Sequence, residues 1–117
     1  MKRGTQGQTG LDDRRFEIHT ESSDGVERVR VRGEIDLSVV GKLDSEMRRA
    51  EATEASKIEL DLDQLDFLDA SGVRLLLDLA QRSRRNGRRL RIRPANSPQV
   101  RRVLELTGVV EHLPLEA

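Results

Sequence analysis

The stretch Leu65–Gly87, LDFLDASGVRLLLDLAQRSRRNG, contains an apolar strand-like segment, a short polar loop and an amphipathic helix in direct succession. Gly87 favours the end of this helix. A strand that leads directly into a helix is typical of an α/β protein. Beyond Ser71 the spacing of three and four residues predicts a single buried helix face, made by Val73, Leu76, Leu77 and Ala80.

Alternating apolar and charged residues predict the strands. The turn signal Ser23-Asp24-Gly25 predicts that the first two strands form a hairpin. The predicted strands are Phe16–Ile18, Val29–Leu37, Ile58–Leu62 and Leu90–Ile92.

Two further helices are predicted by cap residues that precede an apolar stripe. Ser38 is the expected N-cap of a helix with Val40, Leu43, Met47 and Ala50 on one face. Ser97, followed by Pro98, is the expected start of a last helix that ends near Gly108. The tail Val109–Leu115 has apolar residues but no clear pattern. The resulting order is β-β-α-β-α-β-α, in which the later strands should pair in parallel.

Composition excludes several classes of function. Charged residues make up 36% of the 117 residues, but the formal net charge is zero, so nothing attracts the whole chain to nucleic acid or to an anionic membrane. Aromatic residues make up only 2%, which is too few for a base-stacking surface. Cysteine is absent, and the two histidines, His19 and His112, have no supporting ligands, so we expect no metal and no other cofactor.

The ends of the sequence and its hydropathy bear on location. No apolar run is long enough to span a bilayer, and the N-terminus lacks the apolar centre of a signal peptide, so we expect a cytoplasmic protein that does not bind membranes. Residues 1–13 are polar and contain glycine, and we expect them to be a flexible segment ahead of one domain, 14–117.

Ser71 lies where the predicted strand meets the helix, between Ala70 and Gly72. As an N-cap, its Oγ accepts a hydrogen bond from an amide of the first turn. As a functional group, the same hydroxyl is open to a second molecule, because Gly72 adds no bulk beside it. Asp69 either stabilises its own loop through an Asx-type hydrogen bond or contacts a partner. The residues alone leave both interpretations open.

Four stretches together resemble the STAS domain, the module of bacterial anti-sigma factor antagonists and of sulfate transporter tails. The resemblance implies a single α/β domain with a mixed, mostly parallel sheet of four or five strands and helices packed on it. It covers roughly Phe16 to Leu115. The stretches are VRGEIDLS (Val31–Ser38), IELDLDQLDFLDASGVRLLLDL (Ile58–Leu79), NGRRLRI (Asn86–Ile92) and VRRVLELTGVVEHLPL (Val100–Leu115).

In the antagonist branch of that family, a partner anti-sigma factor, itself a serine kinase, phosphorylates a serine or threonine of the loop before the helix. The resemblance therefore implies that Ser71 is the phosphorylated residue of a non-enzymatic protein. Ala70 replaces the second hydroxyl residue of the usual loop. The implied partners are the anti-sigma factor kinase and a serine phosphatase, with a monomer when free. The implied partner-binding residues are Asp36, Asp69, Ala70, Ser71 and Gly72.

Two other functions compete with this one. A STAS domain can also be a scaffold that is not phosphorylated, in a stress-sensing or lipid-trafficking complex. Alternatively, a basic cluster binds nucleic acid, although zero net charge and missing aromatics favour a solvated helix end and no direct nucleic-acid partner. This cluster contains Arg82, Arg84, Arg85, Arg88, Arg89, Arg91 and Arg93.

Overall fold

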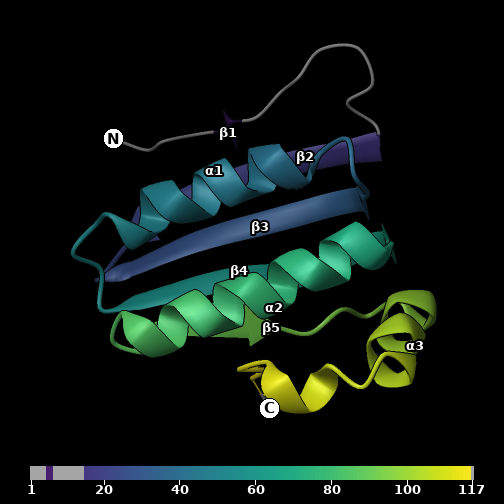
Figure 1. Ribbon diagram of the computed structural model, residues 1–117. Coiled ribbons are helices and arrows are strands. Elements are labelled where there is room, and N and C mark those ends of the chain that lie inside the picture. Colours follow the sequence, from purple (N-terminus) through teal and green to yellow (C-terminus); the bar gives the residue numbers. More distant parts are fainter. Residues whose placement is uncertain (1–4, 7–14, 117) are drawn as a thin grey trace.

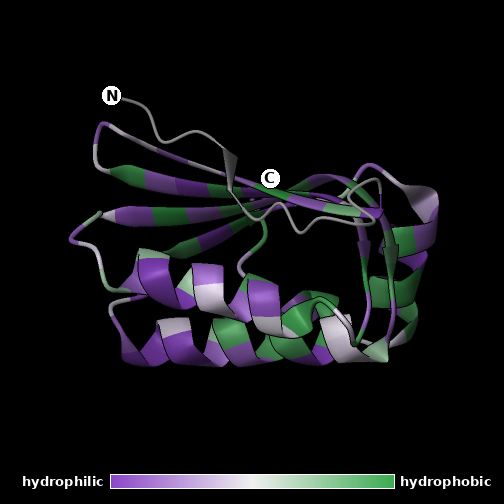
Figure 2. Cartoon of the chain, turned by 90° about the horizontal axis from the view of Figure 1, so that it is seen from above, coloured by the Kyte–Doolittle hydropathy of each residue, from purple (hydrophilic) through white to green (hydrophobic). Residues whose placement is uncertain are grey.

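The computed structural model describes residues 5–6 and 15–116, which form one five-stranded sheet with the two long helices on one face (Figures 1 and 2). The strands are β1 (Thr5–Gln6), β2 (Phe16–Ser23), β3 (Val26–Ile35), β4 (Lys57–Leu68) and β5 (Leu90–Arg93). The helices are α1 (Val40–Glu51), α2 (Ala70–Arg85), α3 (Pro98–Leu106) and the short 3₁₀ helix η2 (Val110–His112).

Strand order along the sheet is β1-β2-β3-β4-β5, the same as along the chain. The pairs β1–β2 and β2–β3 are antiparallel, whereas β3–β4 and β4–β5 are parallel. The predicted fold class, the element order and the mixed sheet are confirmed. The predicted flexible segment 1–13 lies outside the described residues except for Thr5–Gln6, which pair with β2, and the domain boundary stays a prediction.

The core lies between the sheet and helices α1 and α2, which run side by side on the same face of the sheet (Figure 2). This arrangement follows from the period-two pattern, which turns every second strand residue towards the helices. The fully buried side chains of this core include Val29, Val31, Leu60 and Ile92 from the sheet, and Leu43, Met47, Leu76 and Leu79 from the helices.

The opposite face of the sheet carries ion pairs across neighbouring strands. Arg28 donates to Glu59, and Arg30 donates to Asp61 with a distance of 3.1 Å between Nε and Oδ2. Glu59 and Asp61 are only 2% and 1% exposed, so these carboxylates depend on their arginine partners. The hydrogen bond that Arg28 donates to Glu59 is the main cause that raises the pKa of Arg28.

Two local predictions need correction. Ser38 does not cap α1: the N-cap is Val39, which makes no side-chain hydrogen bond. Leu37 is not on the buried face of a strand, because β3 ends at Ile35 and Leu37 is 75% exposed. The unassigned tail forms η2 and then returns to the sheet, where Leu115 bridges Ile92 in parallel.

Within residues 15–116, no helix has both the length and the apolar character needed to cross a bilayer. The same part of the chain contains no group of three or more histidine, aspartate or glutamate side chains arranged to hold a metal ion.

Candidate functional site

Strands β3 and β4 end side by side, and their following loops lie at the same end of the sheet (Figure 1). Ile35 is paired with Leu68 in the parallel register, and the backbone amide of Asp69 donates to the carbonyl oxygen of Ile35 at 3.2 Å. Asp36 and Asp69 are therefore the first residues of two adjacent loops. The fold thus brings together Asp36 and Asp69, two of the residues that the family resemblance implies as partner-binding.

Asp69, and not Ser71, is the N-cap of α2. Its carboxylate Oδ1 accepts from the backbone amides of Ser71, at 2.9 Å, and Gly72, at 3.2 Å. Asp69 has extended backbone angles, whereas α2 begins at Ala70, so Ser71 is already the second helical residue. The cap interpretation of Ser71 is wrong, and the predicted Asx-type hydrogen bond of Asp69 is confirmed.

The Ser71 hydroxyl donates to Asp69 Oδ1, with 2.6 Å between the two oxygens. Ser71 is half-buried, and its neighbour Ala70 is exposed. The hydrogen bond to the Asp69 carboxylate thus holds the Ser71 side chain in one orientation at the solvent boundary. Such a group is suited to being recognised and modified by a second molecule.

Asp36 makes the corresponding contacts in the neighbouring loop. Its Oδ1 accepts from the backbone amide of Ser38 at 2.9 Å and from the Ser38 hydroxyl at 2.7 Å. The hydrogen bond from the Ser38 side chain is the main cause that lowers the pKa of Asp36, and the charge of Arg15 adds to it. Asp36 is therefore a stable anion beside the Ser71 loop at neutral pH.

Gly72 is needed for a reason other than the predicted one. It is buried, and a Cβ atom at this position would lie 2.3 Å from Leu68 Cδ1 and 3.0 Å from Ile35 Cγ2. The missing side chain faces the core, where it allows the first turn of α2 to pack against the ends of β3 and β4. Glycine at this position therefore anchors the Ser71 loop and does not open space for a partner's approach.

Comparison with known proteins identifies the family. The family model of the STAS domain matches residues 17–117. The chain belongs to the STAS domain family. A search of curated proteins finds no significant match.

Three solved structures share the STAS fold with this chain. The crystal structure of an anti-sigma factor antagonist from Mycobacterium paratuberculosis has 27% identity and a TM-score of 0.75, covering 92% of this chain and 89% of that one. The anti-sigma factor antagonist SpoIIAA in its unphosphorylated form has 25% identity and a TM-score of 0.64, with 86% and 88% covered. A STAS-domain antisigma-factor antagonist from Rhodobacter sphaeroides, at 20% identity and a TM-score of 0.58, covers 69% and 88% and supports the fold alone.

Two exposed apolar residues of this STAS domain lie at the same strand ends and were missed by sequence reasoning. Leu37 directly follows Asp36, and Phe67 lies two residues before Asp69; they are 75% and 45% exposed. Solitary exposed apolar residues are ordinary, but these two flank the loop of the candidate site. Their sequence signal is an apolar residue next to an acid where a strand pattern stops.

The arginine cluster is divided by the fold. Arg82 binds Asp44 and Glu51 of α1, at 2.9 and 3.1 Å. Arg89 donates to three backbone carbonyls, one at the last residue of α1 and two in the loop that follows it. Arg93 lies 3.9 Å from Glu59 and from Asp61. The solvated-helix-end interpretation is therefore wrong for these three residues, which join elements of the domain.

Proposed function

We propose that this STAS domain is an anti-sigma factor antagonist. Unphosphorylated, it binds an anti-sigma factor that is also a serine kinase, through the surface around Ser71, and a sigma factor is thereby released. The kinase then phosphorylates Ser71, the complex dissociates, and a serine phosphatase restores the hydroxyl. The observation that carries the proposal is the Ser71 hydroxyl held 2.6 Å from Asp69 at the start of α2, at the solvent boundary.

The likeness to two antagonists at 25% and 27% identity supports this role. Phosphorylation is a transfer from ATP in which a bond forms between Ser71 Oγ and the γ-phosphorus. The bond from that phosphorus to ADP breaks, and the hydroxyl proton leaves. Asp69 Oδ1 already accepts the hydrogen bond of this hydroxyl, which supports Asp69 as the residue that orients Oγ for attack.

The N-terminus of α2 stabilises a phosphate on Ser71 less than a free helix N-terminus would. A phosphate at a free helix N-terminus is stabilised by about 0.3–1 kcal/mol. Here the carboxylate of Asp69 already accepts the amides of Ser71 and Gly72, and Asp36 begins the adjacent loop. A phosphate on Ser71 therefore adds about 1.5–2 negative charges beside two carboxylates. We expect this added negative charge to weaken the docking of a partner more than the folding of the domain, because the loop lies at the surface and the core is behind it.

The test compares Ser71 with Ser38, which has the same hydrogen bonds to its own aspartate. Partner affinity is measured by calorimetry with the anti-sigma factor kinase, for Ser71→Ala, Ser71→Asp, Ser38→Ala and Ser38→Asp. We expect Ser71→Asp to weaken binding by about a hundredfold or more, since like charges at a docked surface cost several kcal/mol. Ser71→Ala should bind without being released by ATP.

Mass spectrometry after incubation with the kinase and ATP gives the second readout. A phosphate on the peptide that contains Ser71 supports the switch. Tight binding with no phosphate on that peptide contradicts the switch and favours the alternative of a non-phosphorylated STAS scaffold. Equal affinity of Ser71→Ala and Ser71→Asp for the partner rules out docking through this loop.

A further inference from the structure

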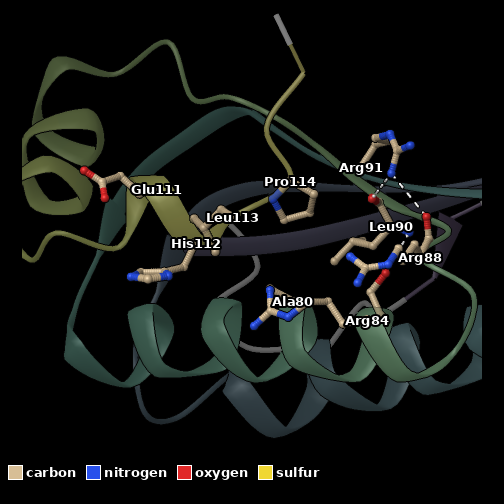
Figure 3. A pocket seen from close by; sticks show the side chains of 10 residues that line it. Ala80, Arg84, Arg88, Leu90, Arg91, Glu111, His112, Leu113 and Pro114 are labelled. Carbon is tan, nitrogen blue, oxygen red and sulfur yellow. Dashed lines mark hydrogen bonds between the residues drawn. The ribbon is translucent and has the colours of Figure 1, made fainter.

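A cavity of about 400 Å³ lies at the opposite end of α2 from Ser71 (Figure 3). Its walls come from the last turns of α2, the start of β5 and the segment from η2 to Pro114. A volume of this size is within the range of small-molecule sites. The lining residues that matter to its chemistry are Arg84, Arg88, Arg91, Leu90, His112 and Leu113.

Three arginines, Arg84, Arg88 and Arg91, line the cavity together with a single carboxylate, that of Glu111. None of the described residues forms an ion pair with Arg84 or Arg88, in contrast to Arg82 and its two carboxylates. In Figure 3 the Arg84 and Arg88 side chains lie between α2 and the C-terminal segment, whereas the carboxylate of Glu111 points away from them. The C-terminal dipole of α2 is unfavourable to an anion, but two full positive charges outweigh a partial one.

Arg91 and the backbone of Arg88 add to this arrangement. Arg91 donates to the carbonyl oxygens of Arg88, at 3.2 Å, and Leu90, at 2.8 Å. These hydrogen bonds reduce the repulsion that the two oxygens would exert on an anion. Arg88 has a φ of 57°, a left-handed conformation that favours glycine or asparagine. Its amide is held there by a 2.7 Å hydrogen bond to the carbonyl of Ser83, so the turn keeps an arginine at the cavity despite its backbone preference.

The other wall of the cavity is apolar and fixed. Leu90 and Leu113 are 4% and 8% exposed, and Pro114 lies beside them (Figure 3). Ile92 donates to the carbonyl of Pro114 and accepts from the amide of Glu116, each at 2.9 Å, which pins the C-terminal segment to β5. The cavity therefore does not depend on a closing motion.

We infer that this cavity binds a small organic phosphate, with its phosphate on Arg84 and Arg88 and its apolar part against Leu90, Leu113 and Pro114. This site is separate from Ser71 and goes beyond the proposed partner switch. A second hollow of about 450 Å³ follows the exposed side of α2 from Ala70 to Arg84 and His112. The two hollows share Arg84 and His112, so a bound phosphate lies on the same side of the helix as the loop of the candidate site.

The experiment is an NMR titration of the ¹⁵N-labelled full chain with 1-naphthyl phosphate, inorganic phosphate and 1-naphthol at constant ionic strength. We expect 1-naphthyl phosphate to bind most tightly and to shift the amides of Arg88, Leu90 and Leu113. Arg84→Gln and Arg85→Gln form a matched pair, because both remove one exposed charge from the last turn of α2 and only Arg84 lines the cavity. Arg84→Gln should weaken binding by about tenfold, as expected for one charge-assisted hydrogen bond, and Arg85→Gln should not.

Arg88→Asn is the second variant, because asparagine tolerates the left-handed backbone while the guanidinium is removed. It should also weaken binding by about tenfold. Equal losses for Arg84→Gln and Arg85→Gln, or shifts spread evenly over all exposed arginines, would mean unspecific charge attraction and overturn the inference. Inorganic phosphate that binds as tightly as 1-naphthyl phosphate would overturn the assigned apolar contact and with it the organic ligand.

Discussion

The loops that follow β3 and β4 have the same local structure and different consequences. Each contains an aspartate, one intervening residue and a serine, and each aspartate Oδ1 accepts from both the amide and the hydroxyl of its serine. After β4 the same carboxylate also accepts from Gly72 and caps α2 directly. After β3 the helix begins later, behind Val39, which provides no side-chain cap.

The hydrogen-bond motif alone therefore does not make a functional site. Ser38 is exposed in a turn, whereas Ser71 belongs to the first turn of a helix whose next residue is packed into the core. The Ser71 hydroxyl is thereby connected to the core through its own helix, whereas the Ser38 hydroxyl is connected only to its loop. We attribute this to Gly72 and to the third hydrogen bond of Asp69, and the following experiments separate these contributions.

The largest expected effect comes from adding one methyl group at Gly72. In Gly72→Ala, the new Cβ meets Leu68 and Ile35, and we expect a loss of about 2 kcal/mol in the free energy of unfolding, typical of an overpacked core. Gly41→Ala in the first turn of α1 is the control, because no atom lies within 4 Å of its added Cβ. It should stabilise the protein by about 0.5 kcal/mol through helix propensity. Urea denaturation measures both, and equal effects would contradict the packing role of Gly72.

The second comparison removes each aspartate. Asp69→Ala takes away the cap of α2 and the acceptor of the Ser71 hydroxyl, which should cost about 1–2 kcal/mol in the free energy of unfolding. Asp36→Ala removes no helix cap, and we expect a loss of about 0.5 kcal/mol or less. Thermal and urea denaturation at pH 7 provide the test. Similar losses for the two variants would show that the loops are equivalent in stability.

The smallest effect concerns the ionisation of Asp36. Its folded pKa is lowered, chiefly by the hydrogen bond from the Ser38 side chain, so its contribution to stability is present above its ordinary pKa of about 3.9 and is lost as the pH falls through the folded value. In Ser38→Ala we expect the pKa of Asp36 to rise towards that ordinary value. A carboxyl-detected NMR titration measures the change. A pKa of Asp36 that does not rise in Ser38→Ala would contradict this cause.

Sequence reasoning succeeded where a pattern repeats over several residues. The alternating strands and the stripe of α2 each depend on many side chains, so their types were predicted even though β4 extends further than expected, to Leu68. It failed where two groups compete for the same hydrogen bonds. Asp69 and Ser71 are both good cap residues, and the choice depends on where β4 stops, which is set by pairing of Leu68 with Ile35.

The candidate site was predicted in part for the same reason. The resemblance assigned Asp36 and Asp69 to one partner-binding site, and the structure brings them into adjacent loops because β3 and β4 are parallel and end together. The roles of Arg82 and Arg89 depend on α1, which is distant in the sequence, and no local pattern distinguishes them from Arg84 and Arg88. The strand β1 is too short for its pairing to leave a periodic signal.

The unchanged order of the strands has a consequence for synthesis. Each strand from β2 onwards pairs with one that precedes it directly in the chain, so the sheet can grow by one strand at a time as the polypeptide leaves the ribosome. The growing edge ends at β5, where Ile92 receives its last backbone partners from Pro114 and Glu116. A nascent chain that stops before these residues leaves Ile92 without these backbone partners at the edge of the sheet, so we expect truncation before Pro114 to make the domain more prone to edge-to-edge association.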